Sequence, residues 1–281
     1  DGAFVERVLA EDLIGPAHAT AVDLDQDGDT DILVSVLGNL RPDDDVIGSL
    51  VVLENEGGAF RQRVLLDGVR RVADAQPGDF DGDGDQDLLG TSRQDHQVIW
   101  YEKRITKKNT VTWTKHLVDN QSKFPAHGNP ADMDGDGDMD IVMALGFYFR
   151  PGSKSASASE RAHDNQIVWY ENQVGTEPAS WRKHVIAKKF DDAFEAVAGD
   201  LDGDGDMDVV ATSWRNPGRV AWFENTSTSK SLWVQHVLKT NWRSANQVLI
   251  ADLNGDGRPD IAACAEHGSN ELRWWRNEGP Q

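Results

Sequence analysis

The chain has 281 residues, of which 38% are hydrophobic and ten are tryptophan, so it carries enough apolar material for a folded core and is not a disordered protein. Its 48 acidic and 28 basic residues give a formal net charge of −20, which argues against binding nucleic acid or an anionic membrane through a general basic field. No run of about 18 apolar residues could span a membrane, and the single cysteine, Cys264, excludes an internal disulfide framework.

The first predicted element is a strand over about residues 3–10. Its sequence, Phe4-Val-Glu-Arg-Val-Leu9, returns almost unchanged as Phe60-Arg-Gln-Arg-Val-Leu65. After it comes the first of five similar acidic segments, which start at intervals of 52 to 68 residues and occupy residues 23–31, 79–87, 132–140, 200–208 and 252–260. Self-similarity at such a period predicts a repeat architecture. The five segments contain 23 of the 48 acidic residues and one basic residue, Arg258, so the negative charge is a property of five loops.

Within these segments, carboxylates at every second position would repel one another unless a cation lay among them. Oxygen ligands at positions 1, 3 and 5, glycine at position 6 and a backbone carbonyl at position 7 are typical of a calcium loop. An EF-hand would also need glutamate at position 12, where this chain has Val34, Gly90, Met143, Ala211 and Ala263. The pattern therefore predicts about five calcium sites, mainly structural, and excludes EF-hands.

Three strands follow the start of each of the first four acidic segments, and two follow the start of the fifth. The first begins directly after the aspartate at position 9, at residues 32, 88, 141, 209 and 261. An apolar and aromatic strand comes next, at residues 50–55, 98–102, 167–172, 220–225 and 272–277, and a further strand at residues 60–65, 113–118, 181–186 and 233–238. Short strands separated by turns, without a helical period, predict an all-β fold, and four strands per repeat predict a β-propeller.

The predicted domain is a single five-bladed β-propeller over residues 1–281 with four antiparallel strands per blade. Its blades span about residues 18–66, 74–119, 127–188, 195–239 and 247–279. The fifth blade lacks a strand at its end, and the strand at about residues 3–10 matches the missing one. We therefore expect the N-terminal strand to complete the last blade and close the ring.

The Asp-x-Asp-x-Asp-Gly-x-x-Asp loops feeding Ile, Leu or Val strands resemble the FG-GAP/VCBS calcium-binding propeller repeats, although five blades differ from the seven usual in that family. The resemblance implies side-chain ligands at Asp23, Asp25, Asp27, Asp31, Asp79, Asp81, Asp83, Asp87, Asp132, Asp134, Asp136, Asp140, Asp200, Asp202, Asp204, Asp208, Asp252, Asn254, Asp256 and Asp260. It implies backbone carbonyl ligands at position 7, from Asp29, Asp85, Asp138, Asp206 and Arg258.

The residues that do not repeat should gather on the face opposite the calcium loops. His116, His184 and His236 occupy a repeated strand position and are expected to be structural. The unusual residues of the opposite face are His18, His96, His127, His163, His267, Trp214, Arg215, Trp242, Arg243, Arg70, Arg71, Arg93, Lys123 and the segment Phe147-Tyr-Phe-Arg150. They could form a binding surface of aromatic platforms and cationic donors, or an ordinary polar loop surface.

One ring of residues stands five positions before each acidic segment, at the start of the strand that lines the central axis. Its members are His18, Asp74, His127, Glu195 and Gln247. Two histidines and two carboxylates around one axis could bind a transition metal or act as a general acid–base group. They could equally form a hydrogen-bonded plug of a narrow channel.

These patterns predict a secreted or periplasmic protein, because acidic loops of this type need the calcium concentration found outside the cytosol. We expect it to bind an acidic glycan on the face opposite the calcium loops. The expected substrate-binding residues are Trp214, Trp242, Arg243, Arg150, Arg71, His96, His163, His267, Asp74, Glu195 and Gln247.

Two alternatives remain open at this point. A polysaccharide lyase would use Arg93 or Arg215 to neutralise a uronate carboxylate, His18 or His127 to remove a proton, and Tyr148 as the acid. An adhesion or protein-interaction module would present a flatter and less basic surface. The sequence leaves the oligomeric state open.

Overall fold

The computed structural model describes residues 5–38, 46–70, 72–93, 95–107, 110–147, 165–173, 180–214, 217–226, 232–266 and 268–279. Within these ranges the secondary structure consists of nineteen β-strands, without a helix. The strands form five antiparallel sheets, and strands that follow one another in the chain are neighbours in each sheet. This confirms the prediction of an all-β, five-bladed propeller.

The strand bounds follow the repeats. Blade one contains β1 (Pro16–Val22), β2 (Asp31–Val36), β3 (Gly48–Glu56) and β4 (Ala59–Val69). Blade two contains β5 (Val72–Gly78), β6 (Asp87–Ser92), β7 (Gln97–Ile105) and β8 (Val111–Asp119). Blade three contains β9 (Pro125–Ala131), β10 (Asp140–Leu145), β11 (Gln166–Gln173) and β12 (Ser180–Ala187). Blade four contains β13 (Ala193–Gly199), β14 (Asp208–Ser213), β15 (Arg219–Asn225) and β16 (Trp233–Lys239). Blade five contains β17 (Ala245–Ala251), β18 (Asp260–Ala265) and β19 (Glu271–Trp275).

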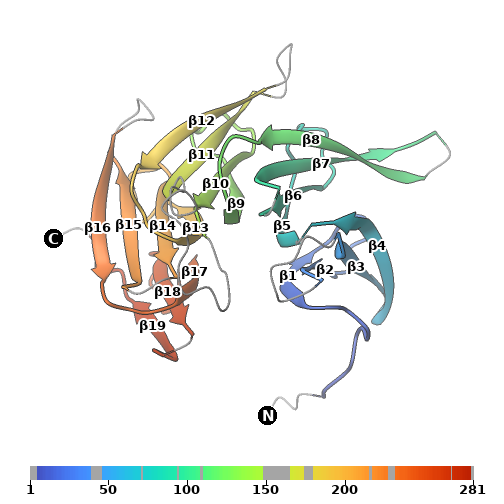
Figure 1. Cartoon of the computed structure of the whole chain (residues 1–281), viewed down its shortest axis with the longest axis horizontal. Coiled ribbons are helices and arrows are strands. Elements are labelled where there is room, and N and C mark those ends of the chain that lie inside the picture. The colour runs from blue at the N-terminus through green and yellow to red at the C-terminus, as the bar shows by residue number, and fades with distance from the viewer. Residues whose placement is uncertain are drawn as a thin grey trace.

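The blades follow one another around a common centre (Figure 1). The first strands of successive blades, β1, β5, β9, β13 and β17, contact one another in that order. The second strands are buried along most of their length, and every residue of β6, β10 and β14 is buried. Since both faces of such a strand are covered by neighbouring blades, continuous rather than alternating hydrophobicity is what the packing requires.

An aromatic residue on the fourth strand packs each of blades two, three and four against the preceding blade. Trp181 of β12 meets Phe80 and Trp100 of blade two edge to face, with ring centroids 5.9 and 6.4 Å apart. Trp113 of β8 packs against the hydrophobic cluster of blades one and two, and Trp233 of β16 against that of blades three and four. These contacts bury large aromatic surfaces between blades and so stabilise the ring.

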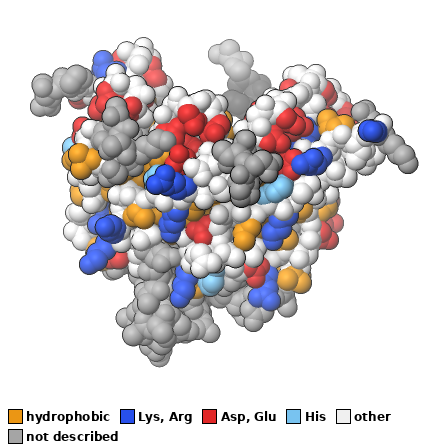
Figure 2. All heavy atoms as spheres, turned by 90° about the horizontal axis from the view of Figure 1, so that it is seen from above, with side chains coloured by type: hydrophobic (Ala, Val, Ile, Leu, Met, Phe, Trp, Pro, Cys, Tyr) orange, Lys and Arg blue, Asp and Glu red, His pale blue; other side chains and the backbone are white. Residues whose placement is uncertain are grey.

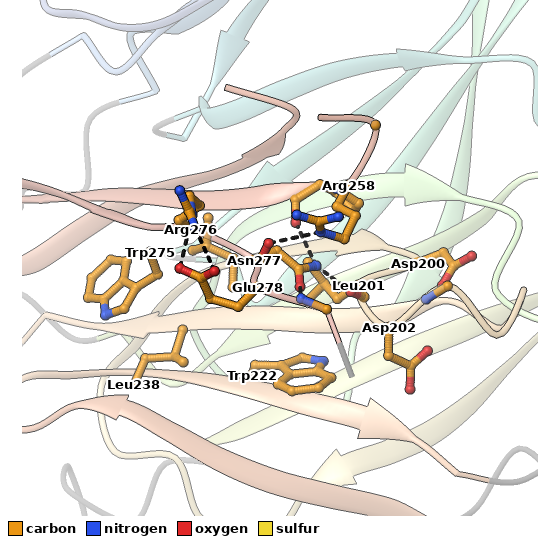
Figure 3. Close-up of a pocket in the computed structure, with 15 residues that line it drawn as sticks. Asp200, Leu201, Asp202, Trp222, Leu238, Arg258, Trp275, Arg276, Asn277 and Glu278 are labelled. Carbon is orange, nitrogen blue, oxygen red and sulfur yellow. Dashed lines mark hydrogen bonds and ion pairs between the residues drawn. The ribbon is translucent and has the colours of Figure 1, made fainter. Parts of the chain in front are cut away.

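A cavity of about 450 Å³ lies at the corresponding place between blades four and five (Figure 3). Leu201 and Trp222, which occupy the repeat positions of Phe80 and Trp100, line it together with Trp275. The fifth sheet contains three strands within the described residues. The cavity is therefore the place that the aromatic side chain of a fourth strand takes in the other blades.

The structure differs from the prediction at the N-terminus, where residues 5–10 of the predicted strand are not in a strand and do not pair with β19. Ala10 and Leu13 instead pack against the hydrophobic cluster of blade one. The carbonyls of Ile14 and Gly15 accept hydrogen bonds from the backbone of residues 38 and 37. These contacts hold the chain at blade one, whereas Phe4, the aromatic of the predicted strand, lies outside the described residues.

Candidate functional site

The acidic loops are folded by hydrogen bonds from their own backbone to their carboxylates. In the third loop, Asp132 accepts hydrogen bonds from the N–H groups of Gly135 and Gly137 at 2.8 and 3.1 Å. Asp136 likewise accepts one from the N–H of Asp138 at 3.1 Å. Both glycines have positive φ, 75° and 97°, which a residue with a side chain adopts at a cost. The loop therefore turns tightly enough to bring alternate carboxylates together.

Four of the five loops fit a calcium ion. In each, three carboxylates offer oxygens that lie within 4.8 Å of one another: Asp23, Asp25 and Asp27; Asp79, Asp81 and Asp87; Asp132, Asp134 and Asp136; Asp200, Asp202 and Asp204. Buried carboxylate oxygens without a hydrogen-bond partner within the described residues occur in the first three loops, on Asp23, Asp85 and Asp138. Hard oxygen donors that converge in this way are what Ca²⁺ prefers.

The aspartate at position 9 has a second role that the sequence analysis did not predict. The two oxygens of Asp140 accept hydrogen bonds from the N–H groups of Met133 in the loop, at 2.9 Å, and Asn172 in β11, at 2.7 Å. Asp31, Asp87, Asp208 and Asp260 make the equivalent pair of bonds, and all five are buried. This residue therefore ties each acidic loop to the third strand of its blade, or in blade five to Asn277 just after that strand. The asparagine that recurs at the end of the third strand was the available signal.

Burial raises the pKa of several loop carboxylates, to about 7 for Asp140 and to about 6 for Asp87 and Asp208. The folded state then binds more protons than the unfolded chain between about pH 4 and 7, so stability without metal should fall as the pH rises through that window. We expect the thermal unfolding midpoint in EDTA to be several degrees lower at about pH 7.5 than at about pH 5. Calcium should raise the midpoint most at the higher pH, because it binds the ionised carboxylates.

Differential scanning calorimetry at the two pH values, with EDTA and with calcium, measures this dependence. A midpoint in EDTA that is equal or higher at about pH 7.5 would show that ionisation of the buried loop carboxylates does not limit stability.

Four members of the predicted ring form a cluster, which we call the central cluster: Asp74, His127 and Glu195 are buried, and His18 is half-buried. One oxygen of Asp74 lies 3.2 Å from Nδ1 of His18, and the other lies 3.8 Å from Nδ1 of His127. Glu195 accepts a hydrogen bond from the N–H of Val248 at 2.6 Å. Gln247, the fifth predicted member, is exposed.

The central cluster has unusual protonation equilibria. Burial alone would raise the pKa of Asp74, but the nearby imidazole of His127 and a hydrogen bond with His18 outweigh burial and hold that pKa well below its usual range. The same hydrogen bond to Asp74 raises the pKa of His18, and burial raises that of Glu195 to about 7. Within the described residues, the groups close enough to hold a metal are those of the acidic loops and do not include this cluster. The cluster therefore offers no group of three ligand atoms close enough together for a transition metal.

An aromatic cluster, formed by Phe147, Phe194 and Trp214, connects the central cluster to Arg93. Phe194 stacks on His127 with ring centroids 4.7 Å apart, and Phe147 meets Phe194 edge to face at 4.8 Å. The Phe147 ring also meets Trp214 at 5.5 Å and has the guanidinium of Arg93 at 4.9 Å from its centroid. The structure thus links His127, Trp214 and Arg93 through two phenylalanines. Phe194 was not predicted as a site residue, because it belongs to no sequence motif.

Trp214 continues this surface toward Arg243. Its indole N–H donates to a carboxylate oxygen of Glu266 at 2.8 Å, and the N–H of Glu266 donates to the carbonyl of Ser244 at 3.1 Å. Arg243, the residue before Ser244, is exposed. An aromatic ring that is fixed by a hydrogen bond loses little entropy when a ligand stacks on it.

Trp242 does not form the exposed platform that was predicted. It is 2% exposed, packs edge to face on Trp275 with centroids 5.9 Å apart, and donates its indole N–H to Glu271 at 3.0 Å. The physical reason is that blade five offers an apolar wall at this point, formed by Trp275 and its neighbours, which the indole covers. Trp242 is therefore part of the core.

The remaining predicted residues are placed as follows. The His96 ring meets Phe124 with centroids 4.5 Å apart, and its Nδ1 accepts the N–H of Phe124 at 3.2 Å. Six predicted residues lie outside the described part of the chain: Arg71, Tyr148, Arg150, His163, Arg215 and His267.

The three repeated histidines stack on tryptophans and pair with glutamates, namely His116 with Trp100 and Glu102, His184 with Trp169 and Glu171, and His236 with Trp222 and Glu224.

Acidic and basic side chains are unevenly distributed over the face seen in Figure 2. Figure 2 shows Asp and Glu side chains gathered in patches toward the top of the view, and Lys and Arg side chains spread over the middle and lower part. This distribution agrees with the sequence, in which the residues outside the five acidic segments are nearly neutral. The net charge of −20 therefore does not describe the whole surface.

The fold and its loops define a five-bladed β-propeller with acidic loops between the first and second strands of its blades. A family profile described as FG-GAP-like repeat matches residues 23–90, 79–143 and 200–263, and the chain belongs to this family. No curated protein sequence matches.

Among solved structures, the chain is similar to the V. cholerae biofilm matrix protein Bap1, with a TM-score of 0.49 and 16% identity. The match covers 95% of this chain and 38% of that one, so the chain spans well under half the length of that protein. The described part of the chain holds no helix with the length and apolar character that a membrane crossing would need.

Proposed function

We propose that this chain is an extracellular binding module that binds a glycan on the face carrying the aromatic cluster. FG-GAP-like repeats fit an extracellular binding or adhesion module. The proposal includes Ca²⁺ at the acidic loops, where it would neutralise converging carboxylates and hold the loops in shape. Secretion to the cell exterior or the periplasm follows from the calcium concentration that such loops need.

The observation that carries the proposal is the partly exposed Trp214 ring, which packs on Phe147, a buried ring that also contacts the buried guanidinium of Arg93. Aromatic side chains stack on the apolar faces of sugar rings, and a partly exposed indole held by Glu266 offers such a face. Arg243 adds an exposed guanidinium beside Ser244, and guanidinium groups bind carboxylate or sulfate in a bidentate manner. This combination supports an acidic glycan as the ligand.

Replacing Trp214 by alanine should weaken glycan binding about tenfold or more, because the stacking surface is lost. A glycan array with calcium present identifies the ligand, and titration calorimetry with that glycan measures the change. Trp274→Ala is the matched control, since Trp274 is exposed on β19 of blade five. Equal affinity of Trp214→Ala and the wild type would contradict the proposed site.

A polysaccharide lyase is the second candidate function, and the His18–Asp74 pair is the observation that favours it. A carboxylate that orients a histidine is a common arrangement for general base catalysis. His18 or His127 would remove a proton next to a uronate carboxylate, and Arg93 would neutralise that carboxylate. Incubation with uronic-acid polysaccharides, followed by absorbance of the new C4–C5 double bond, distinguishes the candidates. Product formation that His127→Ala abolishes supports the lyase, whereas binding without product supports the module.

A further inference from the structure

The fifth acidic loop differs from the other four in its chemistry. It spans residues 252–260 and has Asn254 at position 3 and Arg258 at position 7, where the other loops have aspartate. With its acids ionised, the loop has a formal charge of −2, compared with −5 for each of the others. Because the affinity of such loops for Ca²⁺ depends on the charge of the ligands, this loop should attract the ion least.

The side chain of Arg258 pairs with a carboxylate of its own loop and reaches the segment after β19, where Figure 3 shows it beside Asn277. Its Nη2 lies 2.5 Å from a carboxylate oxygen of Asp256, and its Nε donates to the carbonyl of Asn277 at 3.0 Å. The Asn277 side-chain amide in turn donates to the carbonyl of Pro259 at 3.1 Å. Arg258 therefore ties the fifth loop to the segment that follows β19.

The first carboxylate of the loop accepts backbone N–H groups, as Asp132 does in the third loop. One oxygen of Asp252 accepts the N–H groups of Gly255 and Asp256 at 2.7 and 3.1 Å, and the other accepts that of Gly257 at 2.8 Å. All nine residues of this loop are described. None of them contributes a buried side-chain oxygen without a partner, and none belongs to a group of carboxylates close enough to hold a metal.

We infer that the guanidinium of Arg258 takes the place of calcium in the fifth loop, so that the chain binds Ca²⁺ at four loops and holds the fifth without metal. A divalent cation placed among these residues would face the positive charge of Arg258 and compete with it for Asp256. This inference rests on the proposal that the other four loops bind calcium.

The experiment is a calcium count on the folded chain, by equilibrium dialysis followed by elemental analysis. We expect four ions per chain for the wild type and five for Arg258→Asp, which restores aspartate at position 7. Asp138→Arg, the reverse change in the third loop, should leave three. Arg276→Asp, at another arginine that lines the same cavity, is the control and should leave four.

Five ions in the wild type, or four in Arg258→Asp, would overturn the inference while leaving the calcium proposal intact. Binding of no calcium by the wild type would overturn both.

Hydrogen exchange on the wild type gives a second readout that needs no variant. In EDTA, the N–H groups of Gly255 and Gly257 should keep their protection, whereas those of Gly135 and Gly137 should lose it. Equal loss in the two loops would also overturn the inference.

Discussion

Replacing Asp140 by alanine is expected to lower the free energy of unfolding by about 2–5 kcal/mol, since it leaves two buried N–H groups without acceptors. Those groups belong to Met133 in the acidic loop and Asn172 in β11, and the Asp140 side chain between them is fully buried. Urea denaturation followed by tryptophan fluorescence measures the loss.

The measurement should be made both with calcium and in EDTA, because Asp140 is also a predicted calcium ligand. The hydrogen bonds do not need the metal, so most of the loss should persist in EDTA. Glu11→Ala, at an exposed acid, is the control and should change the free energy by less than about 0.5 kcal/mol. A loss that occurs only with calcium would mean that Asp140 acts through the metal alone.

Trp242→Ala should destabilise the fold by about 3–5 kcal/mol, the usual cost of removing a fully buried tryptophan. The substitution removes the contact with Trp275 and leaves a cavity in the cluster that joins blades four and five. It also removes the hydrogen bond to Glu271. Chemical denaturation at a fixed calcium concentration measures the effect.

Trp274→Ala provides the comparison, because its side chain in the same blade is 51% exposed, and it should cost only about 1 kcal/mol. Equal costs for the two variants would mean that Trp242 is not part of the core. Loss of glycan binding by Trp242→Ala with unchanged stability would restore its predicted role as a platform.

The scaffold could be predicted from the sequence because its signals are local and occur five times. The aspartate at position 9 followed by an apolar residue marks the start of the second strand, and β2, β6, β10, β14 and β18 all begin at that aspartate. The fourth strand was also predicted from its repetition, although the contact of its aromatic residue with the preceding blade was not. That contact joins residues far apart in the chain, such as Phe80 and Trp181.

The site was less predictable because its contacts are long-range and do not repeat. Trp214 and Trp242 are both tryptophans followed by arginine in loops, yet one is partly exposed and the other is buried. The difference depends on Trp275 and Glu271, which the local sequence does not reveal. The central ring was predictable because its members share a repeat position. Gln247 departs from it, next to an irregularity in the pairing of β17 with β18.

The N-terminal segment shows that a repeated sequence pattern does not determine where a strand pairs. Residues 4–9 match residues 60–65 in pattern, and pattern alone assigns them to a fourth strand. The structure places residues 10–15 against blade one, where Leu13 enters an apolar cluster and the backbone pairs beside β2. A match of hydrophobic pattern predicts that a segment can form a strand, but it does not show which sheet edge the segment reaches.

The central claim is that the ligand binds beside the aromatic and central clusters and not at the acidic loops. Hydrogen–deuterium exchange with and without the glycan found on the array, in saturating calcium, tests it most directly. We expect slower exchange in the segments around His127, Phe194, Trp214 and Glu266, with exchange in the acidic loops unchanged. Slower exchange confined to residues 23–31, 79–87, 132–140 and 200–208 would contradict it.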